Sequence, residues 1–308
     1  MPKTLVLFNP NSGRAGAAKA VHRHFADHPP ATFYETSSSD DAVRASKQAV
    51  HDGFQLIVAA GGDGTVNSVA NGIMAGLADA RDEVDVTMGI VPIGTANDFA
   101  LTLGIPDELD QALELLVSGA RRCVDLVELQ TQSQRRCFAN VAAGGNSDRV
   151  TDALTDEIKQ TWGPLCYLRG AIGVLTDLES YAVVLTFDDE EPLSITLWNI
   201  IVANGRTNAG HLQVAPRASI EDGLLDVVLI RDGTILEFAA LTLQFALNDY
   251  LESDQIIYRQ VRTLEMRSQP PMRFSIDGER IDEQPVVFRA KHRALRMVVG
   301  RGYSAEPE

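Results

Sequence analysis

Short apolar runs alternate with helix-like stretches over about the first 120 residues of the chain. The runs at 4–8, 56–60 and 86–91 are each followed by a polar or glycine-rich turn and then by a helix-like segment. After the second run, apolar residues from Val66 to Ile73 recur at i, i+3, i+4 and i+7, the spacing of one helix face. This alternation favours an α/β domain with a doubly wound, mostly parallel sheet.

The pattern changes at about residue 125, beyond which one β-rich segment follows another. These segments are 181–187, 193–203, 224–231, 272–276, 286–289 and 295–299. Successive strands without helices between them favour an antiparallel β sandwich, with helical insertions at about 151–178 and 234–252. We therefore predict two domains, residues 1–125 and 126–299, and a tail at about 300–308 that packs back on the first.

The most specific chemical signal is the turn Gly61-Gly62-Asp63-Gly64-Thr65. Its glycines allow positive φ and leave no side chains in the way, so backbone N–H groups can approach an anion at the following helix. The carboxylate of Asp63 would repel a polyphosphate unless a cation such as Mg²⁺ lay between them. The turn lacks both the Gly-Lys-Ser/Thr ending of a Walker A loop and the spacing of a dinucleotide fingerprint. It therefore predicts a site for a metal-bound nucleotide.

Polar residues also follow other predicted strands of the first domain. Asn9 comes directly after the first strand, and Thr95 and Asp98 come after the strand at 86–91. Because parallel strands end at the same edge of a sheet, we expect these residues to converge with Asp63.

Two Asp-Gly dipeptides, Asp222-Gly223 and Asp277-Gly278, lie in the β-rich half. Each by itself is first of all a turn signal. Glu279, however, is not needed for a turn. A carboxylate that faced a nucleotide across an interdomain cleft could act as the general base for a hydroxyl acceptor.

The charge of the chain limits its partners. It has 27 Lys and Arg against 42 Asp and Glu, a formal net charge of −15. Such a charge opposes non-specific nucleic-acid binding and gives no help at anionic membranes. The three cysteines form no C-x-x-C pair and no even disulfide set, which favours a reducing cytoplasm. We expect no signal peptide and no transmembrane segment, because no apolar run is long enough for a span.

Five motifs in order along the chain resemble those of the YegS-like lipid kinases, which are relatives of bacterial diacylglycerol kinase. The motifs are Asn9-Pro-Asn-Ser-Gly13, Gly61-Gly-Asp-Gly-Thr65, Pro92-Ile-Gly-Thr-Ala-Asn-Asp-Phe99, Asp222-Gly-Leu-Leu225 and Asp277-Gly-Glu279. Gly-Gly-Asp-Gly alone also occurs in NAD kinases and phosphofructokinases, but the whole series is specific and covers nearly the whole chain.

The resemblance implies that ATP binds in the cleft between an N-terminal nucleotide domain and a C-terminal β sandwich. The residues implied at the nucleotide are Asn9, Thr36, Gly62, Asp63, Gly64, Thr65, Val66, Asn67, Ser68 and Thr95. A Mg²⁺ ion would be held by the Asp222 side chain and by the backbone carbonyls of Ser219 and Leu224.

The resemblance also implies catalytic roles. Asp63, Asp98 and Asp222 would form a water-linked carboxylate and metal network, and Glu279 would activate the lipid hydroxyl. The expected reaction is transfer of the γ-phosphate of ATP to a glycerolipid such as diacylglycerol or phosphatidylglycerol. We expect a cytoplasmic protein that meets its lipid peripherally at the inner face of the membrane.

The acceptor side departs from the family pattern, because Gly144-Gly145-Asn146-Ser147-Asp148 lacks the aromatic residue that many relatives place after the glycines. The apolar residues from Trp162 to Leu178 fit either plain core packing or contact with an acyl chain. Two alternative functions remain at this point. They are a soluble-substrate kinase of the NAD kinase type and a nucleotide-sensing protein without catalysis. Neither the lipid nor the oligomeric state follows from the sequence.

Overall fold

The computed structural model describes residues 2–12, 16–26, 31–81, 84–146, 178–208, 212–234, 237, 240–241, 244, 249–276 and 279–306. The first half contains β1 (Thr4–Phe8), α1 (Ala17–Ala26), β2 (Ala31–Glu35), α2 (Ser39–His51), β3 (Leu56–Gly61), α3 (Asp63–Asp79), β4 (Thr87–Pro92), α4 (Asp98–Thr102) and α5 (Leu109–Ser118). Its strands pair in parallel in the order β4-β3-β1-β2. The predicted α/β domain with a parallel sheet is confirmed.

Helix α3 lies very close to helix α2, and two glycines of α3 explain why. A Cβ atom at Gly72 would stand 2.4 Å from the carbonyl oxygen of Val43, and one at Gly76 would stand 2.7 Å from Cβ of Val50. No side chain fits at either position, so the two helices touch backbone to backbone. These contacts hold α2 against the middle and the last part of α3.

The second half is built from antiparallel strands. They are β5 (Ala120–Gln130), β6 (Arg135–Phe138), β7 (Val141–Gly145), β8 (Tyr181–Phe187), β9 (Leu193–Ala203), β10 (Thr207–Asn208), β11 (Leu212–Gln213), β12 (Leu225–Arg231), β13 (Ile256–Val261), β14 (Thr263–Gln269), β15 (Phe274–Ile276), β16 (Glu279–Ile281) and β17 (Val286–Val299). Apolar residues of these strands form two separate buried clusters among the described residues. A single 3₁₀ turn, η2 (Tyr250–Glu252), is also described. The predicted antiparallel sandwich is confirmed, whereas most of the two predicted helical insertions lies outside the described residues.

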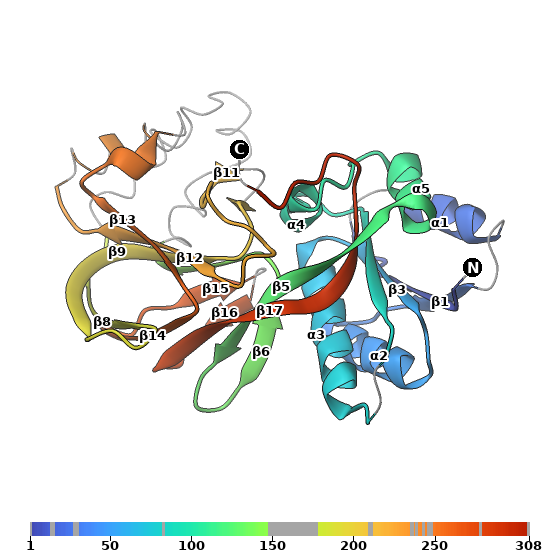
Figure 1. The fold of residues 1–308 in the computed structure, drawn as a ribbon, viewed down its shortest axis with the longest axis horizontal. Coiled ribbons are helices and arrows are strands. Elements are labelled where there is room, and N and C mark those ends of the chain that lie inside the picture. The colour runs from blue at the N-terminus through green and yellow to red at the C-terminus, as the bar shows by residue number, and fades with distance from the viewer. Residues whose placement is uncertain are drawn as a thin grey trace.

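Strands β5 and β17 form a long ribbon that crosses from one half to the other (Figure 1). At its far end Met297 pairs with Met88 of β4, which joins the parallel and antiparallel strands into one sheet. Leu295 and Val299 are buried in the same cluster as the N-terminal sheet. The boundary predicted after residue 125 therefore falls inside β5, on a ribbon that both halves share.

The end of the described chain runs between the two halves. The N–H of Gly300 donates to the carbonyl of Leu103 at 2.9 Å. Beyond it, the hydroxyl of Tyr303 donates to Glu221 at 2.8 Å, and Arg206 donates to the carbonyl of Ser304 at 3.2 Å. These contacts tie the α4 loop to the second half.

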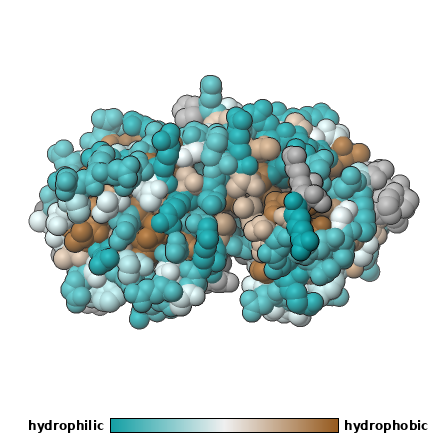
Figure 2. Space-filling model, turned by 60° about the horizontal axis from the view of Figure 1, so that its bottom comes forward, coloured by the Kyte–Doolittle hydropathy of each residue, from teal (hydrophilic) through white to brown (hydrophobic). Residues whose placement is uncertain are grey.

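The described helices include none that combines the length and the apolar character needed to cross a bilayer. On the face shown in Figure 2, hydrophilic residues cover most of the surface, and an indentation at the lower edge separates the two lobes. Cys123 and Cys137 are free thiols, and Cys166 lies outside the described residues.

Candidate active site

A polar cavity of about 380 Å³ lies where the parallel strands of the first half end. It is lined by Asn9, Asn11, Ser12, Thr36, Ser37, Ser38, Ser39, Ala42, Gly62, Gly64, Thr65, Ser68, Gly94 and Thr95. Asn9 and Thr95, which the sequence placed at one sheet edge, line this cavity, whereas Asp63 and Asp98 do not. Sequence reasoning missed Asn11, Ser12, Gly94 and the serines that begin α2. The run of three serines directly after Thr36 was the signal that could have shown the start of α2, and Asn11, Ser12 and Gly94 lie inside two of the quoted motifs.

Two glycine turns form the floor of the cavity and press against each other. A Cβ atom at Gly94 would stand 2.4 Å from Cα of Gly62, so neither turn has room for a side chain between them. The second turn is closed by Asn97, which adopts a left-handed conformation with φ of 55°. Its side-chain oxygen accepts a hydrogen bond from the N–H of Gly94 at 3.0 Å. The close contact and this hydrogen bond fix the relative position of the two turns.

Helices α2 and α3 both begin at this cavity. Helix α2 is capped by Ser38, whose hydroxyl accepts from the N–H of Asp41 at 3.1 Å. Helix α3 starts after Gly62 with no side-chain cap, so its first N–H groups are open to a ligand. The partial positive charges of two helix starts make the cavity favourable for an anion. Asn9 adds a bond from its amide nitrogen to the hydroxyl of Thr65 at 3.2 Å.

Asp63 does not line the cavity but connects its two turns. Its carboxylate oxygens accept hydrogen bonds from the N–H groups of Asp98 at 3.2 Å and Phe99 at 3.0 Å. Burial raises the pKa of Asp63 above its ordinary value, and the nearby Asp98 carboxylate adds to the rise. Asp63 therefore holds the start of α4, which carries the buried Asp98, against the glycine turn. The predicted closeness of these two aspartates agrees with this contact.

Two other residues of the predicted nucleotide segment point away from the cavity. Val66 is buried in the core of the first half, and Asn67 is buried beside Asn71. Neither side chain is among those that line the cavity. Only their backbone groups are available to a ligand there.

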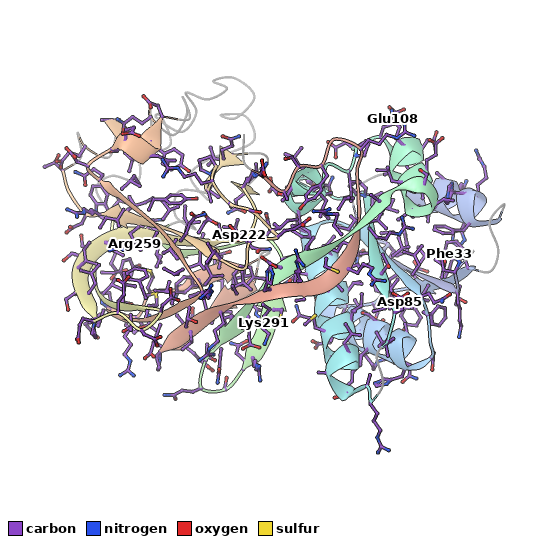
Figure 3. All side chains as sticks on the ribbon, viewed as in Figure 1. Phe33, Asp85, Glu108, Asp222, Arg259 and Lys291 are labelled. Carbon is purple, nitrogen blue, oxygen red and sulfur yellow. The ribbon has the colours of Figure 1, made fainter. Side chains whose placement is uncertain are left out.

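The turn at residues 219–224 carries the predicted metal ligands. Asp222 is exposed, and its Oδ1 accepts from the N–H of Leu224 at 2.9 Å. Burial raises the pKa of Asp222, and the carboxylate of Asp125 raises it further. Figure 3 shows Asp222 in the middle of the molecule, beside the β5–β17 ribbon.

Asp125 is the residue that holds this turn in place. It is completely buried on β5. Its carboxylate accepts from the N–H of Gly223 at 2.6 Å, from the N–H of Arg293 at 2.6 Å and from Nδ1 of His292 at 3.0 Å. Gly223 has a φ of 76° and leaves no room for a Cβ beside the His292 ring. Sequence reasoning gave Asp125 no role, because its partners are remote in the chain.

The described residues contain no group of three or more His, Cys, Asp or Glu that could hold a metal ion. The predicted set of Ser219, Asp222 and Leu224 is of another kind, with one carboxylate and two backbone carbonyls. Oxygen donors of this kind suit Mg²⁺, and the Asp125 carboxylate adds negative charge near Asp222 that a cation would offset. These residues therefore fit a hard divalent cation.

A second buried carboxylate, Asp226, lies on β12 just after the turn. Burial raises its pKa to about 6. Tyr258 and Gln260 both donate to its Oδ1, while its Oδ2 has no hydrogen-bond partner among the described residues. The sequence contained Asp226 next to a motif but showed no reason to single it out.

Glu279 opens strand β16 and pairs with Ile276 of β15. Its side chain, like residues 277–278, lies outside the described part of the chain. Strand β15 pairs with β7, where Asn146 follows Gly145 at the position at which many relatives carry an aromatic residue. The amide nitrogen of Asn146 is buried and donates to the carbonyls of Glu179 and Trp198, both at 2.9 Å. Ser147, Asp148 and the segment from Trp162 to residue 177 lie outside the described residues.

Two family models match this chain. Residues 3–129 match the diacylglycerol kinase catalytic domain, and residues 139–299 match the YegS C-terminal NAD kinase beta sandwich-like domain. A diacylglycerol kinase of Bacillus subtilis is 29% identical over 305 residues, which cover 97% of each protein.

Solved structures share the fold. A diacylglycerol kinase from Bacillus anthracis matches with a TM-score of 0.77 and 22% identity, and the match covers 97% of this chain and 98% of that one. An NAD kinase from Archaeoglobus fulgidus in complex with ATP matches with a TM-score of 0.50 and 12% identity, over 97% and 94% of the two chains. Both family models agree with the two halves of the fold. The chain therefore belongs to the family of lipid kinases that join a diacylglycerol kinase catalytic domain to a YegS-type β sandwich.

Proposed function

We propose that this lipid kinase transfers the γ-phosphate of ATP to a hydroxyl of a glycerolipid, with Mg²⁺ as the cofactor. The observation that carries the proposal is the cavity at which two glycine turns and the starts of α2 and α3 meet. Its size suits a nucleotide, and its open N–H groups suit phosphate oxygens. The names of the Bacillus relatives support diacylglycerol or a similar lipid as the acceptor.

The phosphates would be oriented by the backbone of Gly62 to Ser68, with Asn9, Thr36 and Thr95 around the rest of the nucleotide. No side chain among the described lining residues is charged. The negative charge of a triphosphate would therefore be met by backbone N–H groups and by a bound cation. Asp63 and Asp98 are proposed to hold the two turns at the correct separation.

Mg²⁺, held by Asp222 and by the carbonyls of Ser219 and Leu224, would supply charge neutralisation near the phosphates. Glu279 is proposed to accept the proton of the lipid hydroxyl, a step worth about 10²- to 10⁴-fold in rate. Phosphoryl transfer of this kind depends mainly on positioning and charge stabilisation, and it needs no covalent enzyme intermediate. We place the reaction at the cytoplasmic face of the membrane, where the acceptor is found.

The test is transfer of label from γ-labelled ATP in the presence of Mg²⁺. Three acceptors are compared, namely diacylglycerol vesicles, phosphatidylglycerol vesicles and NAD. Labelled lipid that disappears when EDTA is added supports the proposal. Labelled NADP would instead favour a soluble acceptor, and the absence of any product would contradict catalysis with ATP.

A further inference from the structure

The side chain of Asn71, in the third turn of α3, is bonded to the backbone of another element. Its amide nitrogen donates to the carbonyl of Cys137 at 2.6 Å, and its side-chain oxygen accepts from the N–H of Cys137 at 2.8 Å. The same nitrogen lies 2.9 Å from the carbonyl of Asn67, one helical turn earlier. One amide therefore satisfies both backbone groups of a single residue in the second half.

Strand β6 explains why this contact matters. In the described part of the chain, β6 pairs with β5 alone, where Cys137 lies opposite Glu128. Without a further contact, the backbone N–H and carbonyl groups along its other edge would have no partner. Leaving such groups unpaired costs free energy when they are buried. Cys137 is 9% exposed, so its N–H and carbonyl need a partner. Asn71 supplies the pair of hydrogen bonds that a neighbouring strand would otherwise make.

The contact fixes α3 from a second side. Gly72 presses one side of α3 onto α2, as described above, while Asn71 attaches the other side to β6. In Figure 1, α3 runs beside the β6 hairpin along the junction of the two halves. The chain then continues from β6 through Asn140 into β7, which pairs with β15 ahead of Glu279. A short path of hydrogen-bonded elements therefore connects α3 to the acceptor side.

We propose that Asn71 is a positioning residue that sets the distance between the bound nucleotide and the acceptor side of the cleft. It lines no part of the cavity, so it acts through the placement of α3. The inference rests on the proposed transfer from ATP. Displacements of about 1 Å can cost about 10²-fold in rate even when the substrate still binds. Loss of the Asn71 contact should accordingly lower kcat while ATP affinity is kept.

The test compares Asn71→Ala and Asn71→Asp with the control Gln48→Ala. Gln48 is also a helix amide, but it is exposed on α2 and bonds only locally, to Asp52 at 2.8 Å. The aspartate variant keeps the shape of the side chain and loses the donor to the carbonyl of Cys137. Three quantities are measured on each protein: kcat with lipid, the Kd of MgATP, and the rate at which iodoacetamide labels Cys137, identified by peptide mass spectrometry.

For both Asn71 variants we expect kcat to fall by about tenfold or more, with the Kd of MgATP within about twofold of wild type. Burial raises the pKa of the Cys137 thiol to about 11, so iodoacetamide should label it slowly in wild type. Labelling should be faster in the variants, in which β6 has lost its contact with Asn71. Gln48→Ala should match wild type in all three measurements.

Wild-type labelling of Cys137 in both variants would overturn the inference, and so would an unchanged kcat. If Asn71→Ala does not fold, the isosteric Asn71→Asp decides the question. If wild type showed no transfer from ATP, the proposed function would fail, and the labelling of Cys137 would still decide whether Asn71 holds α3 on β6.

Discussion

The two halves of this kinase build their polar sites in different ways. The cavity of the first half is lined by described side chains that are all uncharged, and several of their hydrogen bonds connect residues within four positions of each other. The second half instead buries whole carboxylates, Asp125 and Asp226. The partners of Asp125 lie 98 and 168 positions away in the chain. Local turns thus shape the nucleotide cavity, whereas tertiary contacts shape the predicted metal turn.

This difference has an energetic meaning. Backbone N–H groups at helix starts and glycine turns are already oriented by local structure, so a small change there should alter binding more than folding. A buried carboxylate is stable only while its remote donors are in place, so its loss should destabilise the fold. Variants in the two halves can separate these effects.

The largest expected effect concerns Glu279 in the second half. Glu279→Gln should lower kcat by about 10²- to 10⁴-fold, because the hydroxyl acceptor would lose its base. The melting temperature should stay at the wild-type value. The exposed Glu265, changed to Gln, provides the control in the same initial-rate assay. Near-wild-type turnover of Glu279→Gln would remove the residue from the proposed mechanism.

Asp125→Ala should cause the largest loss of stability. Three donors, on Gly223, His292 and Arg293, would lose their buried acceptor, and we expect the free energy of unfolding to fall by about 3–5 kcal/mol. Urea unfolding followed by circular dichroism measures the change. Asp282→Ala, which removes an exposed ion pair to Arg273, should cost less than about 1 kcal/mol. Equal losses in the two variants would contradict the comparison between buried and exposed carboxylates.

Asp226 should make stability depend on pH. Its pKa is raised by burial from 3.8 to about 6, so the folded protein binds this proton more tightly than the unfolded chain does. Protonated Asp226 therefore contributes to the free energy of unfolding below about pH 4. This contribution, about 3 kcal/mol in total, is lost as the pH rises through 6. Asp226→Asn should remove this loss, so the difference in unfolding free energy between variant and wild type should grow from pH 4 to pH 7. A constant difference across that range would show that Asp226 titrates normally.

The smallest expected effect lies in the nucleotide cavity. Gly94→Ala would place a Cβ 2.4 Å from Cα of Gly62 and push the two turns apart. We expect the KM for ATP to rise by about tenfold, which corresponds to about 1.4 kcal/mol. Gly302→Ala is the matched control, because a Cβ at Gly302 meets nothing within 4 Å. Steady-state kinetics at varied ATP concentration measure the KM. An unchanged KM in Gly94→Ala would contradict the prediction.

Much of the first half could be predicted from the sequence. Strand, turn and helix follow each other within about 20 residues in each unit, and the spacing of apolar residues identifies which helix face is buried. Parallel order then places Asn9, Gly62 and Thr95 at one edge, where the structure has its cavity. The serines at the start of α2 were missed, because a serine before a helix is ordinarily explained as a cap.

For the second half, the sequence predicted the fold class, an antiparallel β sandwich, but not the pairing of its strands. Alternating residues identify strands and their inward faces, but they do not identify which strand pairs with which. The β5–β17 ribbon joins residues more than 150 positions apart, and its pairing moves the end of β17 into the core of the first half. The contact between Asn71 and Cys137 has no sequence signal either, since a helical asparagine gives no sign of the strand that it will meet.

The sequence by itself determined the order of elements in the first half, the glycine turns and the family of this kinase, because each depends on residues that are neighbours in the chain. The tertiary structure alone decided which side chains join the halves and which carboxylates are buried. Asp63 illustrates both the local sequence and the tertiary structure. Its place in the glycine turn is local, whereas its bonds to the N–H groups of Asp98 and Phe99 exist only because two separate turns pack together. Distant contacts of this kind depend on how the whole chain fills its core, and no short stretch of sequence contains that information.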